Sequence, residues 1–191
     1  MKNLDVRAQY TRRVIEEQFL SLLGEKPYTK ITVTELCQRA HLNRATFYKH
    51  YEDVPDLLEK TEERLLDGLR EVLERHTPGG LYELVLCVAR YMKESGERYI
   101  ALGSGNGDPE LAVRSFELCR ERAYPLLVSN LPGIGEDRRE LLYRFLSQGS
   151  GGVLTAWLRS GMKQPPEELA GFLVGVCSSA ATGLENSRAQ G

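Results

Sequence analysis

Residues 31–58 constrain the fold of this chain more than any other stretch, and their sequence is ITVTELCQRAHLNRATFYKHYEDVPDLL. Thr32 followed by Glu35 has the pattern of a capping box, in which each side chain accepts a hydrogen bond from the other residue's backbone N–H. A short helix is therefore predicted to open at Thr32. Asn43 is a residue type that caps a helix through its side-chain oxygen, so a second short helix is predicted after the connection at residues 41–42.

Two short helices joined by a turn of this length are typical of a helix-turn-helix, whose second helix enters the major groove of DNA. Phe47 and Tyr51 lie four residues apart, so they share one face of that second helix. We expect this face to be core, because the flanking helices must pack against an apolar surface. The opposite face carries polar and basic side chains.

The chemistry of those polar side chains indicates contacts with DNA. The guanidinium of Arg44 can bond a guanine edge, and Asn43 can bond adenine if it does not serve as the cap. Tyr48 combines an apolar ring with a hydroxyl for phosphate, and the start of the preceding helix offers N–H groups to an anion. The candidate DNA-binding residues are Thr32, Thr34, Asn43, Arg44, Thr46, Tyr48, Lys49 and His50.

The segment resembles the DNA-binding domain of the TetR (tetracycline repressor) family of bacterial transcription regulators, over about residues 12–58. Its most specific part is the string Thr-Phe-Tyr-Lys-His-Tyr in front of an acidic, leucine-rich helix. The residues that carry the resemblance are 31–36, 42–51 and 56–58.

Two positions depart from the family pattern. His41 stands where the family usually has Gly in the turn, and Val54 stands where it usually has a Lys that contacts phosphate. A turn position with positive φ favours Gly, and His tolerates such a φ better than most residues do.

The resemblance implies an all-α fold. It consists of an N-terminal helix-turn-helix head of three helices at residues 1–52 and a helical body for ligand binding and dimerisation at residues 53–191. The implied function is that of a homodimeric repressor that binds a palindromic operator in double-stranded DNA. A small-molecule effector in the body would release it. The alternative is a helix-turn-helix regulator with no small-molecule inducer, whose body docks a protein partner.

The distribution of charge suits a DNA-binding head. Residues 1–51 hold nine Lys or Arg and five Asp or Glu, a net charge of +4, whereas the rest of the chain has a net charge of −6. Attraction to phosphate depends on the local charge rather than on the total charge.

No motif of an enzyme, a metal site or a cofactor site occurs, so we expect none of the three. His41, His50 and His76 do not stand at metal-ligand spacing from cysteines or carboxylates, and no phosphate loop follows the glycines at residues 103–107. The first residues are polar and basic, and no run approaches the roughly 18 apolar residues of a membrane span. A cytoplasmic protein without a membrane span is predicted.

The cysteines Cys37, Cys87, Cys119 and Cys177 lie far apart, which fits a reducing compartment better than a disulfide framework. A redox sensor through Cys87 or Cys119 is a third hypothesis. It has little support, because only Arg90 and Arg120 stand close by to lower the pKa of a thiol.

Apolar residues at helical spacing predict the remaining helices. We expect a first helix at about residues 5–23 and body helices at about 53–76, 81–95, 97–102, 108–130, 135–160 and 165–183. A kink is expected near Pro125, and a frayed tail after Gly183. Aromatic and soft side chains on the middle helices are candidates for an effector pocket or for plain core, and they are Tyr91, Met92, Tyr99, Phe116, Cys119, Tyr124 and Tyr143.

The last two helices carry glycines at close spacing, at residues 149–152 and at Gly171 and Gly175. Each Gly costs roughly 1 kcal/mol relative to Ala inside a helix, so the close approach of a second helix is expected. These helices resemble the C-terminal pair through which the TetR family dimerises as a four-helix bundle. The alternative is that they only close the core of one chain. The candidate interface residues are Gly149, Gly152, Val153, Trp157, Leu169, Phe172, Leu173 and Val176.

Overall fold

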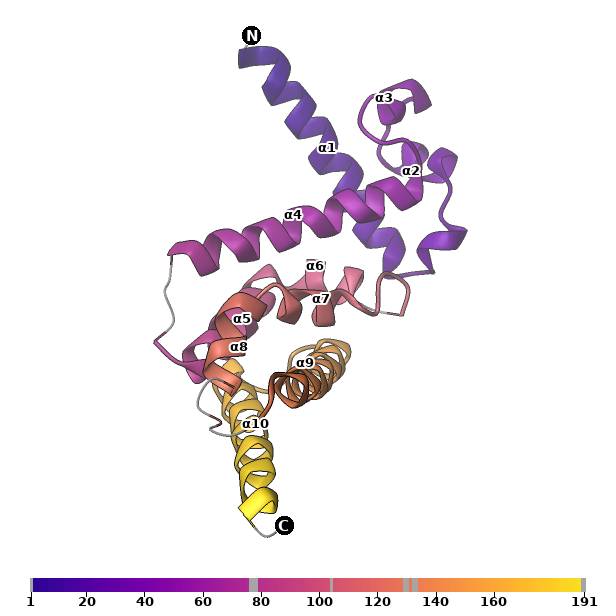
Figure 1. The fold of residues 1–191 in the computed structure, drawn as a ribbon. Helices are drawn as coiled ribbons and strands as arrows, with labels where there is room; N and C mark the ends of the chain where they lie inside the picture. The colour runs from indigo at the N-terminus through magenta and orange to yellow at the C-terminus, as the bar shows by residue number, and fades with distance from the viewer. Residues whose placement is uncertain (1, 76–78, 104, 129–130, 132–133, 190–191) are drawn as a thin grey trace.

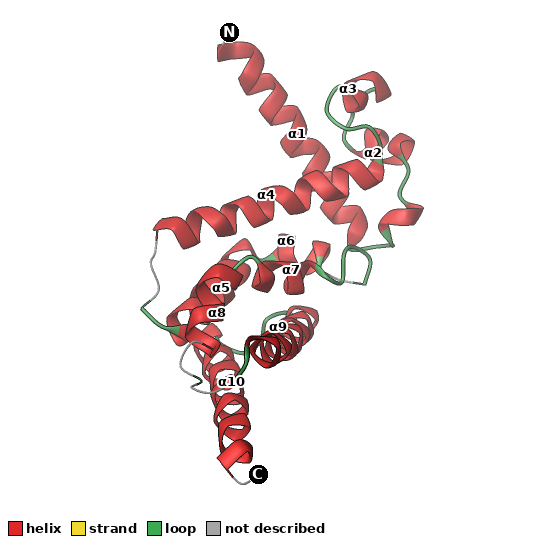
Figure 2. Cartoon of the chain, in the orientation of Figure 1, coloured by secondary structure: helices red, strands yellow, loops and turns green. Residues whose placement is uncertain are grey.

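Every regular element is a helix in this computed structural model, over the residues that the structure describes, which are 2–75, 79–103, 105–128, 131 and 134–189 (Figure 2). The predicted all-α fold is therefore confirmed. Among these residues no helix is both long and apolar enough to cross a membrane.

Five elements make up the head and its connection to the body. They are α1 (Lys2–Leu23), the 3₁₀ turn η1 (Tyr28–Lys30), α2 (Val33–Arg39), α3 (Arg44–Tyr48) and α4 (Val54–Arg75). The body follows with α5 (Leu81–Ser95), α6 (Glu97–Leu102), α7 (Leu111–Glu117), α8 (Arg120–Val128), α9 (Glu136–Arg159) and α10 (Pro166–Ala189).

Helix α4 lies between the two parts of the molecule (Figure 1). It packs against η1 of the head and against α5 and α7 of the body, and the body helices lie along one side of it. Within the body α7 packs against α9, and α10 packs against α5. The buried side chains of head and body form one continuous apolar cluster, so the boundary predicted at residue 53 stays a prediction.

Local capping signals predicted the helix boundaries well. Helices α5 and α6 have the predicted bounds, and α4 begins after Asp53, whose Oδ1 accepts a hydrogen bond of 2.8 Å from the backbone N–H of Asp56. Two predicted ends, His76 and residue 130, lie outside the described residues. The tail expected to fray after Gly183 continues as helix to Ala189.

The prediction of one helix over residues 108–130 with a kink at Pro125 was wrong. The chain breaks earlier, between α7 and α8, and Pro125 lies inside α8. A proline ring clashes with the carbonyl four residues before it. Because α8 starts at Arg120, the displaced carbonyl is that of Glu121, in the first turn of a new helix rather than in the middle of a long one.

The glycines of α9 have two different surroundings. A Cβ placed at Gly151 would lie 2.6 Å from Val113 Cγ2, so this glycine permits the close packing of α7 on α9. A Cβ placed at Gly149 or Gly152 would meet no heavy atom within 4 Å, because both residues face away from the chain's own core. Among the glycines singled out on α9 and α10, Gly151 is the one where the expected close approach occurs within the described chain.

The turn between α2 and α3 contains a non-glycine residue with a left-handed backbone. His41 has a φ of 51°. A positive φ is expected here, because the TetR family, which this segment resembles, usually has Gly at this position. The backbone N–H of Leu42 donates to the carbonyl of Cys37 at 2.9 Å, which closes the end of α2 as in a Schellman motif. This geometry directs the chain into α3.

We expect the His41→Gly variant to be more stable than His41→Ala by about 1 kcal/mol, because a Cβ in the left-handed region is strained and Gly is not. Both variants remove the same exposed side chain, so the comparison isolates the backbone. Thermal unfolding followed by circular dichroism measures the difference. Gln38, an exposed residue inside α2, is the control. There the order of stability should reverse, so that the Ala variant is more stable than the Gly variant. An Ala variant as stable as Gly at position 41 would contradict the proposed strain.

Candidate nucleic-acid interface

The start of α2 presents two hydroxyl groups to solvent, those of Thr32 and Thr34. Thr32 caps the helix, since its Oγ1 accepts a hydrogen bond of 3.2 Å from the backbone N–H of Glu35. The other hydrogen bond of the predicted capping box, from the backbone N–H of Thr32 to the Glu35 side chain, is replaced. The Glu35 carboxylate accepts from Lys26 Nζ at 2.6 and 2.7 Å instead, because a charged donor makes the stronger hydrogen bond.

Asn43 caps α3 as predicted. Its Oδ1 accepts hydrogen bonds from the backbone N–H of Thr46 at 2.7 Å and from the Thr46 hydroxyl at 2.8 Å. The oxygen is therefore engaged in the cap, so the condition set for an adenine contact by this side chain is not met in this structure. The hydroxyl of Thr46 is engaged in the same cap.

The two faces of α3 differ as the sequence predicts. Phe47 and Tyr51 are buried, with 0% and 2% of their surface exposed, whereas Arg44, Tyr48 and Lys49 are exposed. Arg44 Nη2 donates to the Tyr48 hydroxyl at 3.0 Å, and its guanidinium carbon lies 5.7 Å from the centre of the Tyr48 ring. The two side chains therefore contact each other on the exposed face.

His50 is half-buried where α3 ends. Burial lowers the pKa of its imidazole, and the positive charges of Arg12 and Lys49 lower that pKa further. Because Arg12 belongs to α1, basic groups from two helices converge at this end of the head. The carbonyl of His50 accepts a hydrogen bond of 3.5 Å from Lys60, whose Nζ also bonds Asp56 at 2.9 Å.

The hydroxyl of Tyr51 joins three helices. It donates to Glu16 Oε1 on α1 at 3.0 Å and accepts from Arg64 Nη2 on α4 at 3.2 Å. Arg64 and Glu16 form a salt bridge of 2.8 Å, and burial raises the pKa of Tyr51 to about 12. The sequence pattern places Tyr51 in the core but does not show this network. The available signal was that a buried tyrosine hydroxyl requires a partner.

A body loop between α6 and α7 holds the head in place. The backbone N–H of Tyr28 donates to the carbonyl of Asn106 at 2.9 Å, and Asn106 Nδ2 donates to the carbonyl of Leu23 at 2.8 Å. Figure 1 shows this loop reaching the segment between α1 and α2. Gly107 is required there, because a Cβ would lie 2.1 Å from the carbonyl oxygen of Leu102.

Glu62 of α4 is a buried carboxyl at the same junction, with 4% of its surface exposed. Arg114 Nη1 of α7 donates to Glu62 Oε2 at 2.8 Å and contacts Asp108 Oδ2 at 3.0 Å. Glu62 Oε1 is buried and has no hydrogen-bond partner among the described residues. Burial raises the pKa of Glu62 to about 7, which Arg114 opposes and the nearby carboxylates of Asp108 and Glu59 reinforce.

Five of the seven pocket candidates are packed into the core of the body, and they are Met92, Tyr99, Phe116, Cys119 and Tyr143. The Tyr99 hydroxyl lies 3.0 Å from Ser115 Oγ. Tyr91 borders a cavity of about 430 Å³ against α4, which Arg64 and Arg98 also line, and its hydroxyl donates to the carbonyl of Leu65 at 2.7 Å. Tyr124 is half-buried and donates to Glu136 at 2.5 Å.

Burial also determines the state of the cysteines. It raises the pKa of Cys119 to about 12 and raises that of Cys87, although Arg90 and Arg122 oppose the shift at Cys87. A thiol held in its neutral form reacts slowly with oxidants. These surroundings do not favour the redox-sensor hypothesis.

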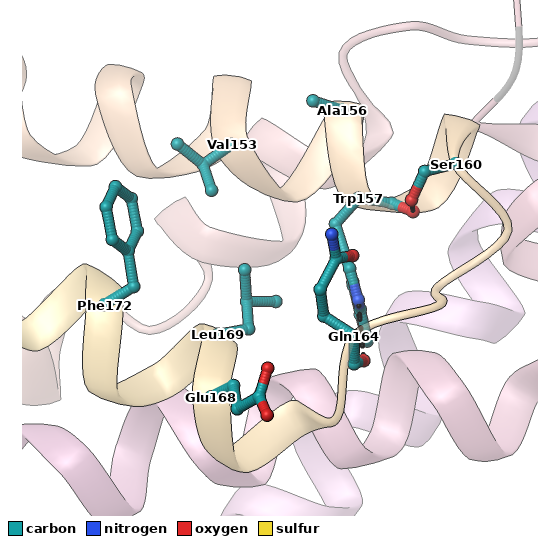
Figure 3. Close-up of a pocket in the computed structure, with 8 residues that line it drawn as sticks. All are labelled: Val153, Ala156, Trp157, Ser160, Gln164, Glu168, Leu169 and Phe172. Carbon is teal, nitrogen blue, oxygen red and sulfur yellow. Dashed lines mark hydrogen bonds between the residues drawn. The ribbon is translucent and has the colours of Figure 1, made fainter.

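The interface candidates on α9 and α10 divide into two groups. Trp157, Leu169 and Leu173 are buried in the chain itself, whereas Phe172 and Val176 are exposed by 59% and 49%. Two further apolar residues of α9, Leu141 and Phe145, are exposed by 67% and 70%, and they were not among the predicted interface residues. A cavity of about 370 Å³ lies between the two helices. Figure 3 shows Val153, Trp157 and Phe172 among the residues that line it.

Comparison with known proteins places this fold among transcription regulators. Residues 81–178 match a family model described as a transcriptional regulator C-terminal region. The uncharacterised HTH-type transcriptional regulator YxbF of Bacillus subtilis (strain 168) is 36% identical over 64 residues, which are 33% of this chain and 17% of YxbF. The aligned part is thus less than a fifth of that relative's length.

Solved structures agree over almost the whole chain. A TetR transcriptional regulator from Streptococcus agalactiae 2603V superimposes with a TM-score of 0.69 and 28% identity, over 92% of this chain and 98% of that chain. The dihydroxyacetone kinase operon activator DhaS matches with a TM-score of 0.63 and 17% identity, over 90% and 96% of the two chains. The fatty acid degradation regulator FadR of Bacillus halodurans matches with a TM-score of 0.58 and 16% identity, over 91% and 96%. The last two likenesses concern the fold alone.

We expect the free energy of unfolding to fall as pH rises from about 5 to 8, through the buried carboxyl of Glu62. The ordinary pKa of this group is 4.5 and its pKa in the folded chain is about 7, so ionisation opposes folding by about 3 kcal/mol at most. Glu62→Gln should remove this slope and raise the stability at pH 8, as measured by urea unfolding at several pH values.

Glu140→Gln is the matched control, and its expected effect on stability at pH 8 has the opposite sign. Hydrogen bonds from Arg120 and Arg144 lower the pKa of the Glu140 carboxyl, so ionisation of this residue favours folding. Its substitution should lower the stability at pH 8. An unchanged pH slope in Glu62→Gln would show that another group titrates.

Proposed function

This chain belongs to the TetR family of transcriptional regulators, and we propose that it acts as a homodimeric repressor whose two heads bind a palindromic operator in double-stranded DNA. The observation that carries the proposal is the exposed face of α3. Arg44, Tyr48 and Lys49 lie there, over a core-facing side formed by Phe47 and Tyr51. A second helix anchored on one side and polar on the other is what entry into a major groove requires.

The proposed contacts follow from the chemistry of each side chain. Arg44 bonds a guanine edge, and Tyr48 supports it through their shared hydrogen bond while its ring packs on sugar or a thymine methyl. Lys49 and His50 bond phosphate next to Arg12, where the positive charges of α1 and α3 converge. Thr32 and Thr34 contact the DNA backbone on the other side of the turn. Thr46 and Asn43 hold the start of α3 in shape through the cap.

Dimerisation is proposed through α9 and α10. Their outward faces carry four exposed apolar side chains, which are Leu141, Phe145, Phe172 and Val176. Added Cβ atoms at Gly149, Gly152, Gly171 and Gly175 would meet nothing within 4 Å, so a second helix can approach closely there. Two such pairs related by a twofold axis would form a four-helix bundle. An apolar surface of this kind is a typical interaction site.

Release from DNA is proposed to follow a shift between two arrangements of head and body. A ligand that binds better to the arrangement whose heads do not fit the operator lowers the affinity for DNA. Helix α4 connects the two parts, and the bonds of Asn106 to Tyr28 and Leu23 hold the loop before α7 against the head. The alternative is a regulator whose body docks a protein partner. The tight packing of Met92, Tyr99 and Tyr143 in the middle of the body favours it.

The experiment that tests the proposal measures binding to the intergenic DNA beside the chain's own gene, with a random duplex as competitor and salt as variable. We expect Tyr48→Ala and Lys49→Ala to weaken binding by about tenfold and to leave melting and dimerisation unchanged. The logarithmic salt slope should fall by about one for Lys49→Ala. Tyr82→Ala and Lys163→Ala, which alter exposed residues of the body, are the matched controls.

Arg44→Ala should relax the preference for the operator more than it lowers affinity for the random duplex. Equal affinity of the wild type for the operator region and the random duplex, at every salt concentration, would count against sequence-specific binding at this site. Unfolding of the Tyr48 or Lys49 variants would refute the assignment of α3.

For the dimer, Phe145→Lys should raise the dissociation constant of the dimer by roughly 100-fold or more, because the twofold axis places the substitution in the interface twice. Analytical ultracentrifugation measures the change. Leu126→Lys alters a 39% exposed apolar residue of α8 and should leave the dimer intact. A monomeric wild type, or equal effects of the two variants, would disprove this interface.

A further inference from the structure

A cavity of about 320 Å³ lies at the junction of head and body, and the proposed contacts with DNA or with a second chain leave it unused. We call it the junction cavity. The head lines it through Tyr28 and the first turns of α4, including Leu58, and the body lines it through Asp108 and Pro109. Its volume is near the lower end of the range for small-molecule sites.

The polar side of the junction cavity is acidic and incompletely paired. Glu59, Glu62 and Asp108 all line it. One nitrogen of Arg114 serves both Glu62 Oε2 and Asp108 Oδ2, at 2.8 and 3.0 Å. Glu62 is nine-tenths buried, and its Oε1 has no hydrogen-bond partner among the described residues. A buried carboxylate oxygen without a donor is costly, so the site favours a ligand that brings an N–H group and a positive charge.

The other side of the cavity is apolar. The ring of Tyr28 and the side chains of Leu58 and Pro109 form it. An inorganic cation would leave this side unused, whereas an organic cation would cover it with its carbon atoms. Ligand sites in general combine apolar walls with a few fixed polar groups.

We propose that the junction cavity binds a small organic ammonium ion, with its N–H on Glu62 Oε1 and its apolar part against Tyr28 and Leu58. This inference rests on the proposed function and deepens it, because it names the site and the chemical class of an effector. The site is separate from the buried aromatic residues of the middle helices.

The position of the cavity couples its occupancy to the head. A bound ammonium ion beside Glu62 and Asp108 shields both carboxylates from Arg114, and it weakens the Arg114–Glu62 salt bridge that joins α7 to α4. The second partner of Arg114, Asp108, belongs to the loop before α7. The neighbouring hydrogen bonds from Tyr28 to Asn106 and from Asn106 to Leu23 hold the head on the same loop. Ligand binding therefore displaces the loop that seats the head, and the affinity for the operator falls.

The first test measures binding of benzylammonium chloride to the free full-length chain at pH 8, with benzyl alcohol as the neutral probe of the same shape. We expect a Kd of about 1 mM for benzylammonium by ligand-observed NMR, and binding of benzyl alcohol at least tenfold weaker. Glu62→Gln and, independently, Asp108→Asn should remove the preference for the cation. Glu168→Gln, which alters a glutamate lining the cavity between α9 and α10, should keep it.

Three results would overturn the inference. One is equal or absent binding of the two probes to the wild type. Another is an unchanged preference in both Glu62→Gln and Asp108→Asn, with folding checked by melting. The third is a thermal stabilisation by MgCl₂ that depends on Glu62 while benzylammonium does not bind, which would assign the cavity to an inorganic cation.

The second test adds 10 mM benzylammonium to the operator-binding assay at constant ionic strength. Operator affinity should fall at least fivefold in the wild type and stay unchanged in Glu62→Gln. Binding of the probe without any effect on operator affinity would refute the coupling to the head. Failure of this inference can be distinguished from failure of the proposed function, because probe binding requires no DNA and operator binding requires no probe.

Discussion

The fixed position of α3 depends on the burial of Tyr51 and on the hydrogen bonds of its hydroxyl. The ring fills the space between α1 and α4, and the hydroxyl meets Glu16 from one helix and Arg64 from the other. Because α3 has only five residues, its own backbone hydrogen bonds cannot hold it in place. The orientation of Arg44, Tyr48 and Lys49 on the opposite face is therefore a consequence of core packing. The proposed contact surface for DNA is therefore preformed by the packing of the head.

The same helix that anchors the head also meets the body, so the two parts are mechanically linked. Glu62 lies less than two turns after Leu57 and Leu58, which belong to the core shared with the head. Its carboxyl is expensive to bury, and it is tolerated because Arg114 pairs with it from α7. Charged groups at such a position hold the two parts together less firmly than apolar packing would. This makes the junction the natural place for a ligand or a proton to act.

Helices α9 and α10 serve two surfaces at once. Trp157, Leu169 and Leu173 close the body of one chain, while Phe145, Phe172 and Val176 on the neighbouring turns point outward. These helices therefore carry apolar residues on more than one face, so their apolar stripe is wider than packing against the core of one chain requires. The glycines follow the same division, since Gly151 packs on Val113 and Gly149 faces open space.

The sequence by itself determined the features that depend on neighbouring residues. The sequence predicted the caps at Thr32 and Asn43, the bounds of α5 and α6 and the two faces of α3. These features all rest on interactions within about four residues, which a linear pattern records. The left-handed turn at His41 was also predictable, through the resemblance to a family that has Gly there. Only the tertiary structure decided which partners meet across long separations. Glu35 bonds Lys26 rather than completing its cap, Tyr51 bonds Glu16 and Arg64, and Glu62 lies against Arg114 and Asp108. The break before Arg120 and the exposure of Leu141 and Phe145 belong to the same class, because periodicity shows that a face is apolar but not what covers it.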